Sequence, residues 1–190
     1  MFNYIFGQLV RSNVAEQENE AIYRYGFEIL TIKILYWISF LVIAAILGFL
    51  LETVMFLLLY SWIRIYAGGY HATSIIKCYA TSLLTVIANC FICGLHMSYE
   101  VTIIENIIFT ISVLYIILNS PVDNKNKVLE DVEKEKYKKY AITITVLYAT
   151  FFLILTCYTD TIGNINIVVM NVVNAEALMM IFGKINNKNR

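Results

Sequence analysis

Two residues in the first half of the chain, His71 and Cys78, have the side chains needed for nucleophilic catalysis. An imidazole can take the proton of a thiol, the thiolate attacks a carbonyl, and the imidazolium then protonates the leaving amine. Both residues follow the pair Gly68-Gly69. The same residues also fit a purely structural role, in which the glycines interrupt a helix and the cysteine packs.

The spacing of His71 and Cys78 constrains how the chain has to fold. In a continuous helix, side chains seven positions apart lie roughly 10 Å apart along the axis, which is too far for a hydrogen bond. Gly68 and Gly69 can adopt backbone conformations that are closed to other residues. We therefore expect the helix before them to break there and the chain to turn back.

A second helix is expected to begin just before the cysteine. Thr73 or Ser74 can cap it, because a hydroxyl oxygen accepts a hydrogen bond from the first helical turn. With a cap at Ser74, Cys78 falls in the fourth helical position. There the helix dipole and Lys77 place positive potential near the sulfur, and free N–H groups of that turn could hold an oxyanion.

The composition predicts that these elements lie in a membrane. Of 190 residues, 59% are hydrophobic and 15% charged, and the mean hydropathy is +0.69. Soluble domains carry about 45–50% apolar and about 25% charged residues. A net charge of zero argues against a nucleic-acid partner, and one proline with eight glycines favours a single domain over residues 1–190. No metal or other cofactor is expected, and the C-x-x-C of Cys90 and Cys93 is interpreted as packing.

An all-α protein with about six transmembrane helices is expected. The apolar segments span approximately residues 29–50, 53–66, 78–95, 103–118, 141–158 and 162–182. The first 28 residues lack the pattern of a signal peptide and fit an amphipathic helix at the interface. The second segment is short and ends at Gly68-Gly69. Residues 121–140 are expected to form a loop followed by a charged helix.

The distribution of charge predicts the orientation. Threading the six segments through the membrane places all 14 Lys and Arg residues on one side, which by the positive-inside rule is the cytoplasm. Both termini and the loop containing His71 are then cytoplasmic. The sixth segment carries Asn164, Asn171 and Asn174 at near-helical spacing, and we expect this polar stripe to be covered in a homodimer.

The run from Arg64 through Gly68, Gly69 and His71 to Cys78 resembles the signature of the AgrB-like membrane endopeptidases, the accessory gene regulator processing enzymes of Gram-positive bacteria. Chain length, hydrophobicity and the lysine-rich stretch that begins at Pro121 are also similar. Family members usually have a proline in that stretch where this chain has Val128, which weakens the inference about the shape of this loop.

The resemblance implies a cysteine protease that acts on a small AgrD-like propeptide with an amphipathic leader and an acidic tail. The enzyme removes the C-terminal tail and retains the remainder as a thioester, which an internal thiol or hydroxyl closes to a thiolactone or lactone. Carried over, Cys78 is the nucleophile and His71 the base. The product is a quorum-sensing peptide, and lipid surrounds the enzyme.

Other residues have open roles. Arg64 either binds a carboxylate of the propeptide tail or anchors the end of its helix. Asp123 could orient His71, although nothing in the sequence places them together. Glu176 is costly in lipid and should face a cavity, a neighbouring helix or lysines. A small non-enzymatic transporter or exporter of a peptide or solute, relying on Glu176 and the asparagines, is the alternative function, and a structural membrane subunit is also open.

Overall fold

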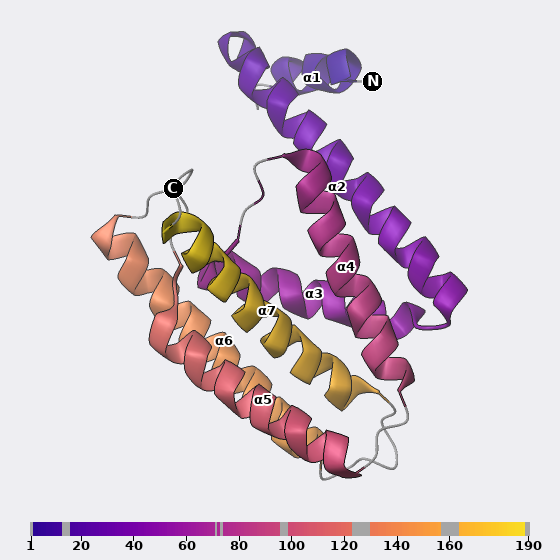
Figure 1. The fold of residues 1–190 in the computed structure, drawn as a ribbon. Coiled ribbons are helices and arrows are strands. Elements are labelled where there is room, and N and C mark those ends of the chain that lie inside the picture. The colour runs from indigo at the N-terminus through magenta and orange to yellow at the C-terminus, as the bar shows by residue number, and fades with distance from the viewer. Residues whose placement is uncertain are drawn as a thin grey trace. The chain divides into compact units, whose positions relative to one another are not determined.

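The computed structural model describes residues 2–12, 16–70, 72, 74–95, 99–122, 130–156 and 164–188. All regular elements in these ranges are helices (Figure 1). The chain divides into two compact units, Met1–Ile43 and Ala44–Arg190. The expectation of a single domain stays a prediction.

In the first unit, a short amphipathic helix folds back on the start of a long one. The elements are α1 (Phe2–Arg11), the 3-10 turn η1 (Gln17–Asn19) and most of α2 (Glu20–Leu47). Phe2 packs against Phe27 with ring centroids 5.6 Å apart, and Phe6 packs against Tyr23 at 5.7 Å. These aromatic contacts hold α1 along α2, so the expected amphipathic segment exists but ends at Arg11.

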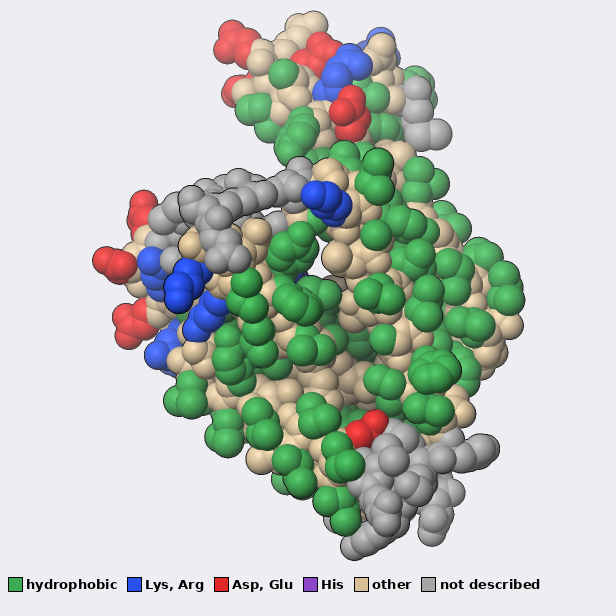
Figure 2. Space-filling model, in the orientation of Figure 1, with side chains coloured by type: hydrophobic (Ala, Val, Ile, Leu, Met, Phe, Trp, Pro, Cys, Tyr) green, Lys and Arg blue, Asp and Glu red, His purple; other side chains and the backbone are tan. Residues whose placement is uncertain are grey.

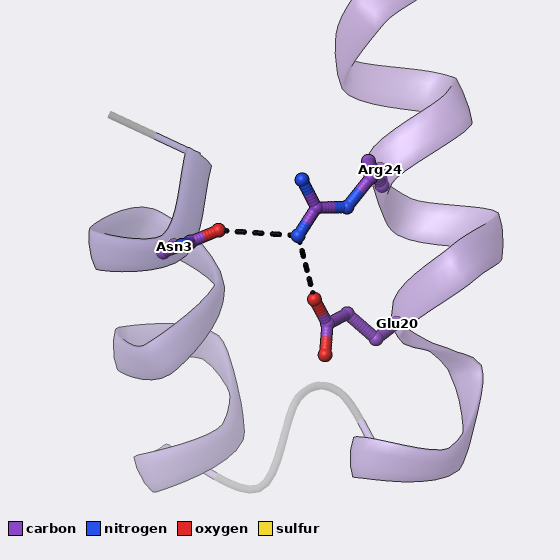
Figure 3. Close-up of polar contacts among 3 residues, drawn as sticks. All are labelled: Asn3, Glu20 and Arg24. Carbon is purple, nitrogen blue, oxygen red and sulfur yellow. Dashed lines mark hydrogen bonds and ion pairs between the residues drawn. The ribbon is translucent and has the colours of Figure 1, made fainter.

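Polar contacts support the same hairpin. Arg24 donates hydrogen bonds to Glu20, at 2.8 Å, and to Asn3, at 3.3 Å (Figure 3). The Glu20–Arg24 pair lies one helical turn apart within α2, and such pairs stabilise a helix. The first apolar helix therefore begins at Glu20, earlier than the sequence predicted, and carries its charged first turns as part of one continuous element.

The second unit is a bundle built around its last helix. It contains α3 (Leu50–Ala67), α4 (Ile75–Gly94), α5 (Tyr99–Asn119), α6 (Asp131–Thr156) and α7 (Ile165–Lys188). Helix α7 contacts each of the other four, and Figure 1 shows it crossing the middle of the unit. In the most apolar 18-residue stretch of α7, 50% of the residues are buried. In the other helices that could span a membrane, the corresponding share is 28% or less. Valines 168, 169, 172 and 173 form the centre of this core.

The outer helices present apolar side chains outward, as expected in lipid. Within the described residues, five helices are long and apolar enough to span a membrane, and a shorter apolar stretch, Ile103–Asn119, lies within α5. Figure 2 shows hydrophobic side chains over most of one face, with Lys and Arg side chains gathered where α6 begins. The prediction of an all-α membrane protein with about six apolar helices is confirmed.

The starts of α3 and α6 also differ from those expected. Helix α3 starts at Leu50 because the preceding turn is made by Gly48, whose φ is 83°. Helix α6 starts at Asp131, so the charged helix predicted after residue 121 and the fifth span are one element. No glycine or proline occurs between Asp131 and Thr156 to separate them.

Candidate active site

Helix α3 ends in two glycines that turn the chain sharply. Gly68 has a φ of 76° and Gly69 a φ of 120°. Residues with a Cβ rarely adopt these values, whereas glycine adopts them without a steric penalty. The helix break predicted at Gly68-Gly69 is therefore confirmed.

The segment after α5 holds this turn on one side. The N–H of Val122 donates to the carbonyl of Ala67 at 2.9 Å, and the N–H of Gly69 donates to the carbonyl of Val122 at 3.4 Å. Gly68 and Val122 thereby form an isolated parallel bridge. A Cβ on Gly68 would collide with the Val122 carbonyl. Glycine at position 68 is thus required by both its φ and its neighbour.

Helix α7 holds the turn on the other side. The N–H of Tyr70 donates to the carbonyl of Met179 at 2.8 Å. A Cβ on Gly183 would lie 2.6 Å from the carbonyl carbon of Gly69 and 2.8 Å from the nitrogen of Tyr70. The turn can approach α7 this closely only because position 183 carries no side chain.

Arg64, in the last turn of α3, ties the turn to the core. Its guanidinium donates to the carbonyl of Gly68 at 2.7 Å and also to the carbonyl of Tyr70. Its Nη1 lies 3.6 Å from Oε1 of Glu176, an ion pair longer than a direct hydrogen bond. The Glu176 side chain is completely buried. Arg64 therefore fixes the backbone of the turn and compensates a buried carboxylate.

The candidate nucleophile lies in the first turn of α4. That helix begins at Ile75, and the Oγ of Ser74 accepts a hydrogen bond from the N–H of Lys77 at 3.3 Å. The predicted cap at Ser74 is confirmed, and Cys78 occupies the fourth helical position. Its thiol is free and exposed, and Lys77 beside it is exposed as well.

The other described cysteines have a different environment. Cys90 and Cys93 are free but only 1% and 6% exposed. The Sγ of Cys90 lies 3.3 Å from the Oγ1 of Thr53 on α3. Both therefore pack in the helix interface, as interpreted from the sequence, and Cys78 is the accessible thiol among the three.

Two of the predicted site residues, His71 and Asp123, lie outside the described residues, as do Thr73 and Cys157. The chain leading to each of the first two is nevertheless placed. Gly69 precedes His71 by two residues and Val122 directly precedes Asp123, and these two neighbours are hydrogen-bonded. The interaction of His71 with Asp123 or with Cys78 stays a prediction.

Sequence reasoning did not identify the residues that clamp the turn, namely Val122, Met179 and Gly183. Val122 and Met179 contribute backbone groups, which nearly all residue types carry, so the sequence gives no sign of these contacts. Gly183 gave a usable signal, because a glycine inside an apolar helix often permits a close approach. Glu176 was expected to face a cavity, a helix or lysines, and its partner is an arginine on another helix. Among the residues that the structure describes, no group of three His, Cys, Asp or Glu side chains could hold a metal.

Two of the three asparagines in the polar stripe of α7, Asn164 and Asn171, have partners within one chain. Asn164 donates to Glu52 at 3.2 Å, and Asn171 donates to Asn89 at 3.0 Å. Asn171 is 6% exposed. These two asparagines therefore do not require a second chain, and the homodimer stays a prediction.

The fold defines the chain as an all-α, multi-pass membrane protein, with an exposed cysteine on the helix that follows a clamped glycine turn. It belongs to the accessory gene regulator B family, because the model of that family matches residues 2–182.

Curated relatives agree with this assignment. AgrB-like protein 2 of Clostridium perfringens (strain 13 / Type A) is 27% identical over 139 residues, which cover 70% of this chain and 65% of that protein. A relative from Listeria monocytogenes serotype 4a (strain HCC23) is 29% identical over 135 residues, or 71% and 65%. The names of both say only that they are AgrB-like. The chain thus matches about 65% of the length of these relatives, and no solved structure matches it significantly.

Proposed function

We propose that this protein is a membrane cysteine endopeptidase that removes the C-terminal tail of a small AgrD-like propeptide and allows the remainder to cyclise. The observation that carries this proposal is the environment of Cys78. It is a free, exposed thiol in the first turn of α4, and a turn fixed by backbone hydrogen bonds leads toward it. A reactive cysteine requires accessibility and positive potential, and a helix N-terminus supplies the latter.

In the proposed first step, His71 takes the thiol proton and the Cys78 thiolate attacks the carbonyl of the scissile peptide bond. The C–N bond breaks, the imidazolium returns the proton to the amine of the departing tail, and an acyl thioester remains on Cys78. In the second step His71 takes the proton of a thiol or hydroxyl of the bound peptide. The sulfur or oxygen attacks the thioester, closes a thiolactone or lactone ring and releases the Cys78 thiolate beside the imidazolium. Limited access of water favours ring closure over hydrolysis.

The structure narrows the expected oxyanion site. The N–H groups of Lys77 and Cys78 already donate to the side chain and the carbonyl of Ser74. Neither of these two N–H groups is therefore free to hold an oxyanion.

A cytoplasmic location of this site is part of the proposal. The end of α3, the end of α5 and the C-terminal half of α7 lie together, because the Gly68 turn contacts both Val122 and Met179 and Lys184 donates to Asn119. Arg64 and Lys184 lie in these parts of the helices. Such clustering of basic residues at one end of the bundle is typical of the cytoplasmic side.

The alternative of a non-enzymatic transporter relied on Glu176 as an intramembrane charge along a pathway. Glu176 is instead buried and paired with Arg64. It does not line the cavity that lies between α4 and α7 in the second unit. This placement favours a structural role for Glu176 and removes the main support for transport.

The test separates cleavage from cyclisation. Cys78→Ala should abolish cleavage of a tailed propeptide in proteoliposomes and leave membrane insertion and propeptide binding intact, whereas Cys90→Ala and Cys93→Ala should cleave nearly normally. A propeptide whose cyclising nucleophile is replaced by Ala should still lose its tail and accumulate on Cys78 as an adduct that hydroxylamine releases. Full cleavage by Cys78→Ala, or an adduct on another cysteine, would contradict the proposal.

A further inference from the structure

A cavity of about 720 Å³ lies inside the second unit, bordered mainly by α4 and α7. This volume is within the range of roughly 300–1,000 Å³ that is typical of small-ligand sites. Tyr70 and Thr81 line it toward the candidate active site, and Ile92 and Glu105 also line it. Thr81 donates a hydrogen bond to the carbonyl of Cys78 at 3.0 Å. The cavity thus begins one helical turn from the candidate nucleophile.

The cavity also opens sideways, between side chains that the protein does not cover. Leu84 on α4 is 69% exposed, and Leu178 on α7 is 54% exposed, although both line it. A ligand could therefore enter between α4 and α7 from the plane of the membrane. An amphipathic peptide at the membrane–water interface would reach the cavity by this route.

Asparagine side chains with unpartnered atoms border the mainly apolar cavity. Asn89 is 2% exposed, and its Oδ1 accepts a hydrogen bond from Asn171 at 3.0 Å. Its Nδ2 has no partner, and neither does the Oδ1 of Asn174. All three asparagines line the cavity. A buried donor and a buried acceptor without partners are unfavourable, and each would gain from a ligand that supplies the complementary group.

The chemistry of the lining selects among possible occupants. A peptide backbone carries one N–H and one C=O per residue, and both need partners in a medium without water. The acyl chain of a lipid offers neither group and would leave both amides unsatisfied. Most of the remaining lining consists of side chains such as Leu84, Leu178 and Phe182, which suit apolar side chains of a peptide.

We infer that this cavity binds a short, mostly apolar stretch of the propeptide next to the scissile bond. The Nδ2 of Asn89 donates to a backbone carbonyl of that stretch, and the Oδ1 of Asn174 accepts from a backbone N–H. This assignment rests on the proposed function and adds to it the site that holds the substrate. Binding here brings the scissile carbonyl to the end of α4 that carries Cys78.

Photo-crosslinking tests the location. A photoreactive phenylalanine analogue replaces Leu84 or Leu178 in the full-length Cys78→Ala protein, which is reconstituted with tailed propeptide in liposomes. Matched controls carry the analogue at Phe91 and Ile181, exposed positions on the same two helices that do not line the cavity. Adducts at 84 and 178 should exceed those at 91 and 181 at least about fivefold. Equal yields at all four positions, the result expected for lipid in the cavity, would overturn the inference.

Kinetics tests the amide contact. Asn174→Leu should raise the KM for propeptide cleavage about 5- to 10-fold, as expected for one lost hydrogen bond, with kcat within about twofold. Asn106→Leu, an exposed change on α5 outside the cavity, should change neither. An unchanged KM in Asn174→Leu, together with uniform crosslinking, would refute the assignment of the cavity as the peptide site. If Cys78→Ala still abolishes cleavage in that case, the proposed function stands. Cleavage by Cys78→Ala refutes the proposed function instead.

Discussion

The guanidinium of Arg64 lies 3.6 Å from the carboxylate of Glu176, joining the end of α3 to the middle of α7. The same guanidinium donates to the carbonyl of Gly68. The Glu176 side chain is completely buried and Arg64 is its ion-pair partner, so removing Arg64 would take the cation away from a buried carboxyl group. The pair therefore links the stability of the bundle to the geometry of the turn that leads to Cys78.

Replacing Arg64 with lysine should reduce propeptide cleavage by at least about tenfold. A lysine carries one compact ammonium group and cannot bind two carbonyls and a carboxylate in the geometry of the planar guanidinium. Cleavage rates in proteoliposomes would measure this. The control is Arg24→Lys, because the Arg24–Glu20 pair is half exposed and exposed pairs contribute only about 0–1 kcal/mol. Normal cleavage by Arg64→Lys would show that the turn does not depend on the guanidinium.

Gly183→Ala should destabilise the second unit by about 1–3 kcal/mol, the usual cost of overpacking, and should lower cleavage. The added methyl would lie 2.6 Å from the carbonyl carbon of Gly69, which belongs to backbone that is already clamped. Thermal unfolding in detergent and cleavage assays would report the two effects. Gly26→Ala is the matched control, because a Cβ there meets nothing within 4 Å. A tolerated alanine at 183 would mean that the turn can move away from α7.

Ser74→Ala should slow alkylation of Cys78, because loss of the cap frays the first turn of α4 and weakens the positive potential at the sulfur. Caps of this kind contribute about 1 kcal/mol. Ser74→Asn should restore the reaction, since asparagine also caps helix N-termini and adds no negative charge near the sulfur. The rate of Cys78 alkylation, followed by mass spectrometry, distinguishes the three proteins. Equal alkylation rates in all three proteins would show that the reactivity of the Cys78 thiol does not depend on the cap at residue 74.

A membrane-impermeant maleimide should label Cys78 from the cytoplasmic side of sealed vesicles and leave Cys90 and Cys93 unlabelled. Cys78 is exposed, whereas the other two are 1% and 6% exposed. Inside-out vesicles that carry Cys157→Ala should therefore take up one label per chain, and right-side-out vesicles none. Labelling of Cys78 from outside would reverse the proposed orientation.

Sequence alone was sufficient for the features that depend on local interactions. The apolar runs predicted the helices, because an apolar segment in lipid satisfies its backbone hydrogen bonds only within itself or in a closed sheet. Gly68 and Gly69 predicted the end of α3, and Ser74 predicted the start of α4. Both depend on the conformational preferences of a few consecutive residues. Helix boundaries such as Glu20 and Asp131 were less well predicted, because charged residues continue a helix as readily as they end one.

Tertiary structure decided what surrounds the candidate site. The contacts of the turn with Val122 and Met179 use backbone N–H and C=O groups, which every residue type except proline carries in full. Arg64 and Glu176 lie 112 positions apart in the chain, and their pairing requires α7 to pack against α3. The cavity likewise exists only between packed helices. Residue types therefore identified Cys78 as the candidate nucleophile, and the packing of α7 against the other helices determined which groups hold the turn before it.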